Sequence, residues 1–330
     1  MENIAVILGD PRLPDPVKPN GKFNKEDIET VNILKRALAE LNEYQFIYLD
    51  NHIKLREDLE KRKKEIHLAL NLCDEGLNNN PKSEKYIPLM LELRKINYTG
   101  ANLRCIELCF DKDKVLKLAK ENDILIPESR LIKRHSPTYR WESKFPVIVK
   151  PNYGDGSFGI NQKSVILDQY NLDIRLHKNN YPLLVQEFLP GNELTVGIIG
   201  NKENYKILPI IEEDYSRLPE ELPKICGYEA KWDQESPYWK LLSSKKSDLS
   251  EKVQQIIIEN SIKLFELTNC RDYARIDWRL DQEGNPRLLE VNPNCGWCND
   301  GHLAKMANLD NISYPEMLNL IIKASEKRLY

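Results

Sequence analysis

The 330-residue sequence predicts an α/β region at its N-terminus and a longer α+β region after it. In the first region, short apolar segments alternate with amphipathic helical segments, which is typical of strands joined by helices. From residue 147 onward, strand-like segments follow one another with few helices between them, which favours antiparallel pairing. The chain is also longer than one average domain of roughly 100–200 residues, so we expect two or three domains.

The N-terminal region begins with a β-branched strand at residues 4–8, which a Gly-Asp-Pro turn follows. The next segment has apolar residues at three- and four-residue steps and predicts an amphipathic helix that carries Ile28, Val31, Leu34, Leu38 and Leu41. A strand at 46–49, a charged helix at 54–64 and an alternating strand at 66–72 come next. An α/β lobe of about 100 residues follows from this order.

The rest of the chain predicts a helix at 111–121 and then a series of strands. We expect these strands at residues 147–150, 165–167, 183–188, 193–199 and 206–211. The polar, proline-containing segment 214–247 predicts a long loop, and loops of that length in compact proteins are usually functional lids or disordered. A helix at 249–267, two strands at 273–280 and 287–292, and a terminal helix at 314–328 complete the prediction.

Composition excludes several classes of protein. The 48 basic and 51 acidic residues leave a net charge of −3, which disfavours nucleic acid or a membrane surface as a partner. No uncharged apolar run reaches the roughly 18–20 residues that cross a bilayer, and the N-terminus does not resemble a signal peptide. The seven scattered cysteines indicate reduced thiols, so we expect a cytoplasmic protein.

Two polar strand faces predict a metal site in the last hairpin. Arg275 and Asp277 share one face of their strand, and Glu290 and Asn292 share a face opposite to Leu289 and Val291, because side chains alternate along a strand. A turn centred on residues 283–284 would place Asp277 opposite Glu290 and Arg275 opposite Asn292. Opposed carboxylates repel each other unless a cation such as Mg²⁺ lies between them. A hairpin with a solvated charged face is the alternative.

A second segment predicts a phosphate-binding loop. An apolar strand ends at Lys150, and Gly154, Gly156, Ser157 and Gly159 follow within a few residues. Glycines let backbone N–H groups approach phosphate oxygens, and Ser157 adds a hydroxyl. The spacing differs from the Walker pattern, and a glycine-rich hairpin without a ligand is the alternative.

A third segment joins two strands through a Pro-Gly pair, as an interdomain hinge does. The first strand ends in Gln186, Glu187, Phe188 and Leu189, and Glu193 begins the second. A glutamate beside such a hinge could bond a ribose, although a β-hairpin would give the same pattern.

The order of these three segments resembles the ATP-grasp fold, and within it the D-alanine–D-alanine ligase group. Tyr98-Thr-Gly100, Cys109-Phe-Asp-Lys112, Tyr228-Glu-Ala-Lys-Trp232 and the segment from Glu290 to Gly296 also resemble that group in order and spacing. The resemblance implies a three-lobed architecture with nucleotide bound between the central and C-terminal lobes. The implied lobes are residues 1–104 for substrate, 105–188 with the glycine-rich loop, and 189–330 with the metal ligands.

The resemblance also implies a role for each matching residue. Lys150 would contact the phosphates of ATP, and the loop 154–159, with Gly156 and Ser157, would close over them. The segment from Gln186 through Glu187 and Phe188 to Leu189 would face adenine, Glu193 would hold the ribose and Lys231 would reach the transferred phosphate. Two Mg²⁺ ions, with Mn²⁺ as an alternative, would be held by Asp277, Glu290 and Asn292. Arg275 and the Gly296 amide would stabilise the tetrahedral centre.

One lysine of the predicted helix 111–121 would also contact ATP. When this sequence is aligned with the family pattern without gaps from Asp111-Lys112, Leu116 falls where the family has its helical lysine. Lys117 is the nearest lysine. We therefore predict Lys117 for this contact.

The substrate half departs from the family pattern. The family's His-Gly-x-x-Gly-Glu-Asp-Gly-like segment is replaced by residues 71–78, the loop 9–14 lacks the serine–glutamate pattern, and the expected serine falls near Gly301 or His302. We therefore expect a ligase that joins a carboxylate to an amine through an acyl phosphate, on an amino acid or small peptide other than D-alanine. A non-catalytic or regulatory nucleotide-binding ATP-grasp protein and an ATP-grasp small-molecule kinase are the alternatives, and a homodimer is a candidate assembly.

Cys295 and Cys298 form a C-x-x-C pair next to the predicted metal ligands. A zinc site would need two further ligands, and His302 is the only obvious neighbour in the sequence. Packing or substrate-lining thiols are the favoured interpretation, with redox sensitivity as the alternative. A structural or solvated role is likewise favoured for His302.

Overall fold

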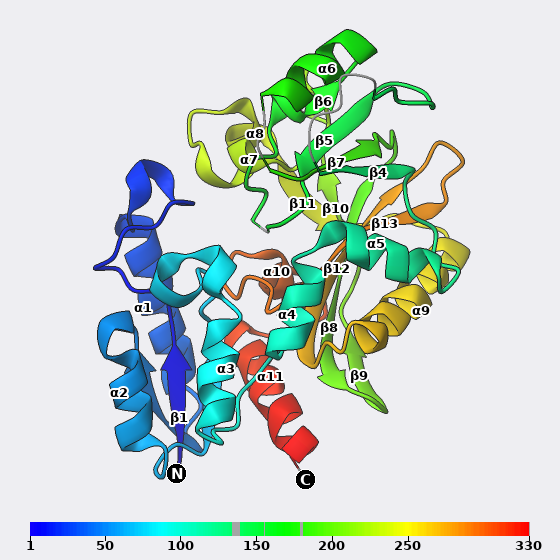
Figure 1. Cartoon of the computed structure of the whole chain (residues 1–330). Helices are drawn as coiled ribbons and strands as arrows, with labels where there is room; N and C mark the ends of the chain where they lie inside the picture. The colour runs from blue at the N-terminus through cyan, green and yellow to red at the C-terminus, as the bar shows by residue number, and fades with distance from the viewer. Residues whose placement is uncertain (134–138, 155, 179–180, 330) are drawn as a thin grey trace.

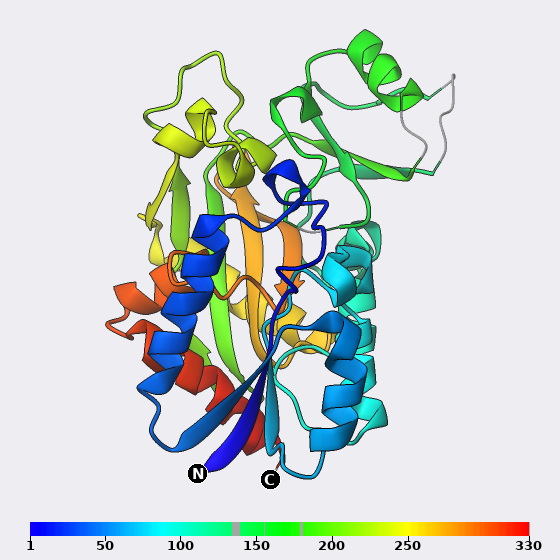
Figure 2. The ribbon, with the colours of Figure 1, turned by 90° about the vertical axis from the view of Figure 1, so that its left-hand side faces the viewer.

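The computed structural model describes residues 1–133, 139–154, 156–178 and 181–329, and these form three sheets with their covering helices. Figure 1 shows the N-terminal sheet beside the large central sheet, and a smaller sheet at the end of the molecule farthest from the two termini. The 90° view in Figure 2 shows the smaller sheet as a separate lobe over the end of the central one. The predicted mixture of α/β and α+β structure is confirmed.

The N-terminal sheet is parallel, with the order β2 (Tyr44–Leu49), β1 (Glu2–Ile7) and β3 (Leu68–Asn71). Alternate residues of β1 enter two different cores: Ile4 and Val6 face α1 (Lys25–Ala39), while Ala5 and Ile7 face α2 (His52–Arg62) and α3 (Tyr86–Leu93). A parallel sheet covered on both faces explains why the strand is continuously apolar. Asn24 caps α1 by accepting hydrogen bonds from the N–H groups of residues 26 and 27.

The smaller sheet is antiparallel and has four strands. Its order is β4 (Ser129–Ile132), β7 (Leu183–Glu187), β5 (Val147–Pro151) and β6 (Val165–Ile166). Helix α6 (Gln169–His177) covers one face through Leu172 and Leu176, which share a core with Val147, Val149 and Val185.

The central sheet has six antiparallel strands and carries most of the polar residues of interest. Its main order is β11 (Ser243–Lys246), β10 (Ile211–Asp214), β8 (Glu193–Asn201), β12 (Asp272–Leu280) and β13 (Pro286–Pro293), with β9 (Asn204–Ile207) paired to β8. The antiparallel pairing predicted for this part of the chain is confirmed.

The two faces of the central sheet are covered by different helices. On one face, Ile276 and Trp278 pack with α9 (Glu251–Leu267), α4 (Leu103–Cys109) and α5 (Lys112–Lys120). On the other face, Tyr273 packs with α10 (His302–Leu309) and α11 (Tyr314–Leu329) and shares a core with the N-terminal sheet. Arg275 and Asp277 lie on this second face, farther along β12, where polar residues replace the core.

Two of the predicted secondary-structure segments differ from the structure. The segment predicted as the single long loop 214–247 contains two short helices, α7 (Tyr228–Trp232) and α8 (Pro237–Leu241), and strand β11. The segment predicted as one strand at 206–211 divides into β9 and β10, which flank different parts of β8. Helices of five residues are too short for a periodic signal, which explains why the sequence pattern missed them.

Four short 3₁₀ turns complete the description, at Pro19–Gly21, Leu77–Asn79, Pro81–Ser83 and Gln162–Ser164. Every helix in the described ranges is too short or too polar to span a membrane.

Candidate active site

A polar pocket lies between the four-stranded and six-stranded sheets. Its walls come from β5, β7, β8, β10, β12 and β13, from the first residue of α10 and from the loop that carries α7. Eleven of the predicted site residues line it, namely Lys150, Ser157, Gln186, Glu187, Phe188, Leu189, Glu193, Lys231, Arg275, Asp277 and Glu290. The fold thus brings together segments that are far apart in the sequence.

The predicted hairpin register is confirmed. Asp277 pairs with Glu290 and Arg275 pairs with Asn292 across β12 and β13. Asp277 is the centre of a hydrogen-bonded group: Arg275 donates through Nε at 3.0 Å and Nη2 at 2.9 Å, and Thr195 Oγ1 and Asn292 Nδ2 each donate at 2.9 Å. Charge-assisted bonds of this kind hold both the carboxylate and the guanidinium in place.

A bulge in this hairpin corrects the predicted position of Leu289. The pairing shifts between Asp277 and Trp278, so that Trp278 lies opposite Leu288 and Leu289 becomes the extra residue. Leu288 is therefore buried in the core, and Leu289 lines the pocket beside Glu290. Strict alternation had placed Leu289 on the face opposite to Glu290.

Two buried lysines face Glu290, and one of them is not the predicted residue. Lys150 on β5 lines the pocket, and Lys112 Nζ at the start of α5 lies 3.3 Å from Glu290 Oε2. Lys112 also donates to the Gly154 carbonyl. Lys117 has a side chain that is 66 % exposed and pairs with Asp113 at 2.6 Å. The helical lysine at this site is thus Lys112, because α5 begins at that residue and turns Lys117 outward.

The charges in the pocket change the acid–base behaviour of its residues. Burial lowers the pKa of Lys150 to about 8, and the nearby Lys112 adds to this effect. Burial alone would raise the pKa of Glu290, but Lys112, Lys150 and Arg275 outweigh burial and hold this pKa well below its usual range. Glu290 is therefore ionised at neutral pH and balances the cations around it.

The lowered pKa of Lys150 leads to a testable expectation. An anionic nucleotide phosphate favours the protonated lysine, so nucleotide affinity should fall as pH rises through about 8. The fall should approach about tenfold per pH unit above that point. Calorimetric titration of Mg·ATP between about pH 7 and about pH 9.5 measures it. Lys150→Met should bind weakly with a flat pH dependence, and an equally flat dependence in the unaltered protein would contradict the role of Lys150.

Glu193 and the hinge form the opposite wall of the pocket. Glu193 Oε2 accepts hydrogen bonds from Tyr215 Oη at 2.7 Å and from Arg279 Nη1 at 3.0 Å. Burial raises the pKa of Glu193, although Arg279 opposes that effect. The Arg279 guanidinium also lies over the Phe188 ring, 4.8 Å from its centroid. Gln186 donates to Ser129 Oγ at 2.9 Å, which links the hinge to the edge strand β4.

The glycine-rich loop contacts the segment that carries Lys231. Ser157 Oγ donates to the Cys226 carbonyl at 3.1 Å, and Trp232 Nε1 donates to the Gly156 carbonyl at 3.4 Å. Gly154 and Gly156 have φ values of 127° and 57°, and a Cβ at either position would meet open space, so backbone conformation and not crowding favours glycine. Asp155, inside the predicted loop 154–159, lies outside the described residues.

The segment after β13 lies between the pocket and the N-terminal lobe. A Cβ at Gly296 would be 3.9 Å from Asp74 Oδ2, and Trp297 Nε1 donates to the Leu72 carbonyl at 2.6 Å. Burial raises the pKa of Cys295 to about 12 and also raises that of Cys298. These shifts favour the protonated thiol at both positions.

The pocket contains residues that the sequence patterns did not identify as ligands. These are Thr195, Arg279 and the pair formed by His302 Nε2 and Glu213 Oε1 at 2.8 Å. Lys112, which contacts Glu290, was also missed. The sequence pattern could have predicted Arg279, because alternate residues of a strand share a face and Arg279 follows Arg275 and Asp277 on the same face of β12. Glu213 could not, since it belongs to an acidic run that reads equally well as a solvated surface.

Two antiparallel sheets that enclose a pocket with buried lysines on one side and paired carboxylates on the other define an ATP-grasp protein. The sequence profile described as "D-ala D-ala ligase C-terminus" matches residues 128–323. The chain belongs to the D-alanine–D-alanine ligase family, and it is an ATP-binding, ATP-dependent ligase of that family.

Individual relatives are distant. The D-alanine–D-alanine ligase of Aquifex aeolicus is 29% identical over 238 residues, which cover 71% of this chain and 75% of the relative. An uncharacterized protein of Sinorhizobium fredii, y4sG, is 28% identical over 247 residues, or 74% and 71% of the two chains.

Solved structures match nearly the whole chain in fold. The D-alanine–D-alanine ligase of Bacillus anthracis complexed with ATP has a TM-score of 0.73 and 20% identity and covers 99% of this chain and 98% of its own. The D-Ala:D-Ser ligase of Enterococcus faecalis has a TM-score of 0.70 and 17% identity, with 98% and 99% covered.

Proposed function

We propose that the chain joins the carboxylate of one amino acid or small peptide to the amine of another, and that its preferred substrate is not D-alanine. The observation that carries the proposed chemistry is the group formed by Arg275, Asp277 and Glu290 in one pocket with two lysines, Lys150 and Lys231. A third lysine, Lys112, contacts Glu290. Phosphoryl transfer needs cations around the phosphates, and the later tetrahedral centre needs a fixed cation near its oxygen.

Asp277, Glu290 and Asn292 suit Mg²⁺, for which two ions are proposed and Mn²⁺ is an alternative. Ionised carboxylate and amide oxygens are the ligands that this metal prefers, and the amide nitrogen of Asn292 is already bonded to Asp277, which leaves its oxygen available. When bound, the metal neutralises charge on the nucleotide phosphates.

The reaction proposed has two steps. A substrate carboxylate oxygen attacks the γ-phosphorus of ATP, and the bond from that phosphorus to the β–γ bridging oxygen breaks. The products of this step are ADP and an acyl phosphate of the substrate. The amine of the second substrate then attacks the acyl carbon, loses a proton and displaces inorganic phosphate. Lys112, Lys150 and Lys231 would hold the phosphates, while Arg275 and the Gly296 amide would stabilise the oxyanion.

Water must be kept from the acyl phosphate. The contacts of Ser157 with residue 226 and of Trp232 with Gly156 join the glycine-rich loop to the Lys231 segment over the pocket. Tyr215, Leu218, Ile225 and Tyr238 form a small apolar core under this cover, packed against Ile148 and Phe188. We infer that the two loops close as one unit over bound nucleotide.

The acceptor side supports a substrate other than D-alanine. Where the family pattern has its His-Gly segment, this chain has Asp74 and Glu75, and Lys18 Nζ lies 2.9 Å from Asp27 and 3.6 Å from Glu75. Near the expected serine, the chain has the His302–Glu213 pair. Charged groups that differ from those of the family reject a mismatched substrate strongly when they are left unpaired.

Mg·ATP should raise the melting temperature of the protein. A ligand that binds only the folded state stabilises it, by about 2.7 kcal/mol at a concentration of 100 times its Kd. Differential scanning fluorimetry with and without Mg·ATP measures the change, with Mg²⁺ alone as the control. No shift at a nucleotide concentration on the order of 1 mM would count against the proposed pocket.

D-Alanine should support little ATP turnover, while another amino acid or peptide supports much more. The preference could reach about 10⁴-fold, because unpaired buried polar groups penalise the wrong ligand. Parallel assays of ADP and phosphate with a panel of D- and L-amino acids and dipeptides test this. Ligation releases both products in equal amounts, whereas a kinase releases ADP alone. Efficient formation of D-alanyl-D-alanine would refute the proposed specificity.

The three-lobe division at residues 104 and 188 and a homodimeric assembly are also proposed. Helices α4 and α5 pack in the core of the six-stranded sheet, although the division places α5 and all but the first two residues of α4 with the central lobe. Limited proteolysis would locate the boundaries, and light scattering after gel filtration would give the mass of the assembly.

A further inference from the structure

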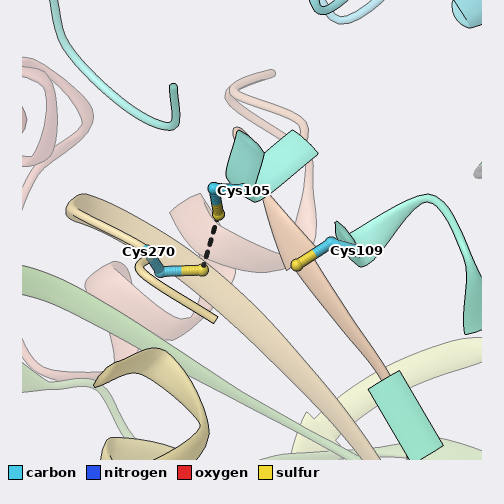
Figure 3. Close-up of side chains that lie close together, drawn as sticks. All are labelled: Cys105, Cys109 and Cys270. Atoms are coloured by element: carbon cyan, nitrogen blue, oxygen red, sulfur yellow. Dashed lines mark hydrogen bonds between the residues drawn. The ribbon is translucent and has the colours of Figure 1, made fainter. Parts of the chain in front are cut away.

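Three cysteine thiols converge in the core that joins α4 to the central sheet, in a different hydrophobic cluster from that of the loop over the pocket. Cys105 and Cys109 are one helical turn apart on α4, and Cys270 lies just before β12 (Figure 3). The Cys105 and Cys270 sulfurs are 3.6 Å apart, and all three sulfurs lie within 4.8 Å of one another. We call these residues the cysteine triad.

The spacing of the sulfurs fits one metal ion. A metal–sulfur bond of about 2.3 Å places thiolates about 3.8 Å apart in a tetrahedral site and about 4.0 Å apart in a trigonal one. The Cys105–Cys270 distance of 3.6 Å is close to these values and no pair is more than 4.8 Å apart, so small movements of side chains suffice. Thr268 Oγ1, 3.3 Å from Cys270 Sγ, offers an oxygen as a fourth ligand.

We propose that the cysteine triad binds a soft, thiophilic divalent cation of the Zn²⁺ type. Cysteines often serve as small apolar residues in cores, and that role explains their burial. A packing role does not, however, explain why Cys105 and Cys109, four residues apart, both face Cys270, which lies 161 positions after Cys109 in the chain. Among the described residues, only one other group of three potential ligands is this close, and it lies nearer the surface at Glu2, His67 and Glu326.

Binding of a divalent cation to the cysteine triad releases protons and changes the net charge of the site. Three S–H bonds break, three metal–sulfur bonds form and three protons pass to solvent, which leaves a divalent site with one net negative charge. Because all three thiols must lose a proton before the ion binds, affinity should rise with pH, as it does at other thiolate sites.

The position of the cysteine triad indicates what the ion would do. Helix α4 leads directly into α5, whose first residue is Lys112, and Cys270 leads into β12, which carries Arg275 and Asp277. An ion at this point would join the two elements that bring these residues into the pocket. It would stabilise the fold without contacting nucleotide or substrate.

The experiment uses the full chain, reduced and stripped of metal by a chelator. Cd²⁺ is titrated as the probe, and the ultraviolet charge-transfer band of cadmium thiolate is followed. We expect one equivalent of Cd²⁺ per chain and a rise in melting temperature with either Cd²⁺ or Zn²⁺ in the absence of ATP. Cys105→Ala and Cys109→Ala, made separately, should each abolish the tight band and the thermal shift.

Two controls distinguish the cysteine triad from other thiols. Cys73→Ala removes a buried cysteine elsewhere in the chain, and the double variant Cys295→Ala, Cys298→Ala removes the C-x-x-C pair. Both should keep the band and its stoichiometry. No band in the unaltered protein, a band that survives in the folded triad variants, or a band lost with the C-x-x-C pair would each overturn the proposal.

Discussion

Glu290→Gln should lower the turnover of the enzyme by about 10²- to 10³-fold, the loss typical when one charged stabilising group is removed from a transition state. The change keeps the shape of the side chain and removes one negative charge from the proposed metal ligands. Glu290 is ionised, contacts Lys112 and interacts electrostatically with Lys150, so the variant should also bind Mg·ATP more weakly. The rate of ADP release at saturating nucleotide is the measurement.

The melting temperature should change much less than the activity, because Glu290 lies at the pocket wall and not in the apolar core. Glu283→Gln is the matched control, since it removes the same charge from the exposed turn of the same hairpin and should leave both quantities unchanged. Parallel losses of melting temperature and activity in Glu290→Gln would instead indicate a structural residue.

Lys112→Met should reduce turnover by about 10²-fold, whereas Lys117→Met should leave it close to that of the unaltered enzyme. The two lysines belong to one helix, yet only Lys112 contacts Glu290 and the carbonyl of Gly154. Removal of Lys112 takes a buried cation from the phosphate side of the pocket, while removal of Lys117 breaks an exposed pair of little energetic value.

The pair of variants is informative because each serves as the control for the other. Steady-state kinetics and the affinity for Mg·ATP should separate them, and circular dichroism should show that both remain folded. A large loss with Lys117→Met and none with Lys112→Met would restore the assignment made from the ungapped sequence reading.

Much of the fold follows from local patterns. The β-branched, apolar character of residues 4–8 predicted a strand of an α/β lobe, and the alternation along β12 predicted one core face and one polar face. The short helices α7 and α8 were not predicted, because their segment is polar and each helix has only five residues. Such helices are held by tertiary packing, here around Tyr238 and Ile225, more than by their own propensity.

The sequence likewise placed some residues of the candidate site correctly and missed or misplaced others. Asp277 and Glu290 were placed opposite each other correctly, because the turn fixes the register of a short hairpin. Leu289 was placed on the wrong face, because a bulge inserts one residue without a clear sequence signal. The partners of Glu193, which are Tyr215 and Arg279, come from other segments and could not be read from its own strand.

The sequence by itself determined the class of the protein, the order of its nucleotide-binding segments and the polar face of each strand. These properties depend on the two-residue period of a strand and on residues close together in the chain. Only the tertiary structure decided that Lys112 and not Lys117 faces Glu290, and that Cys270 meets Cys105 and Cys109. The phase of a helix relative to a distant strand is set by how both pack on a common core, and no local pattern carries that information.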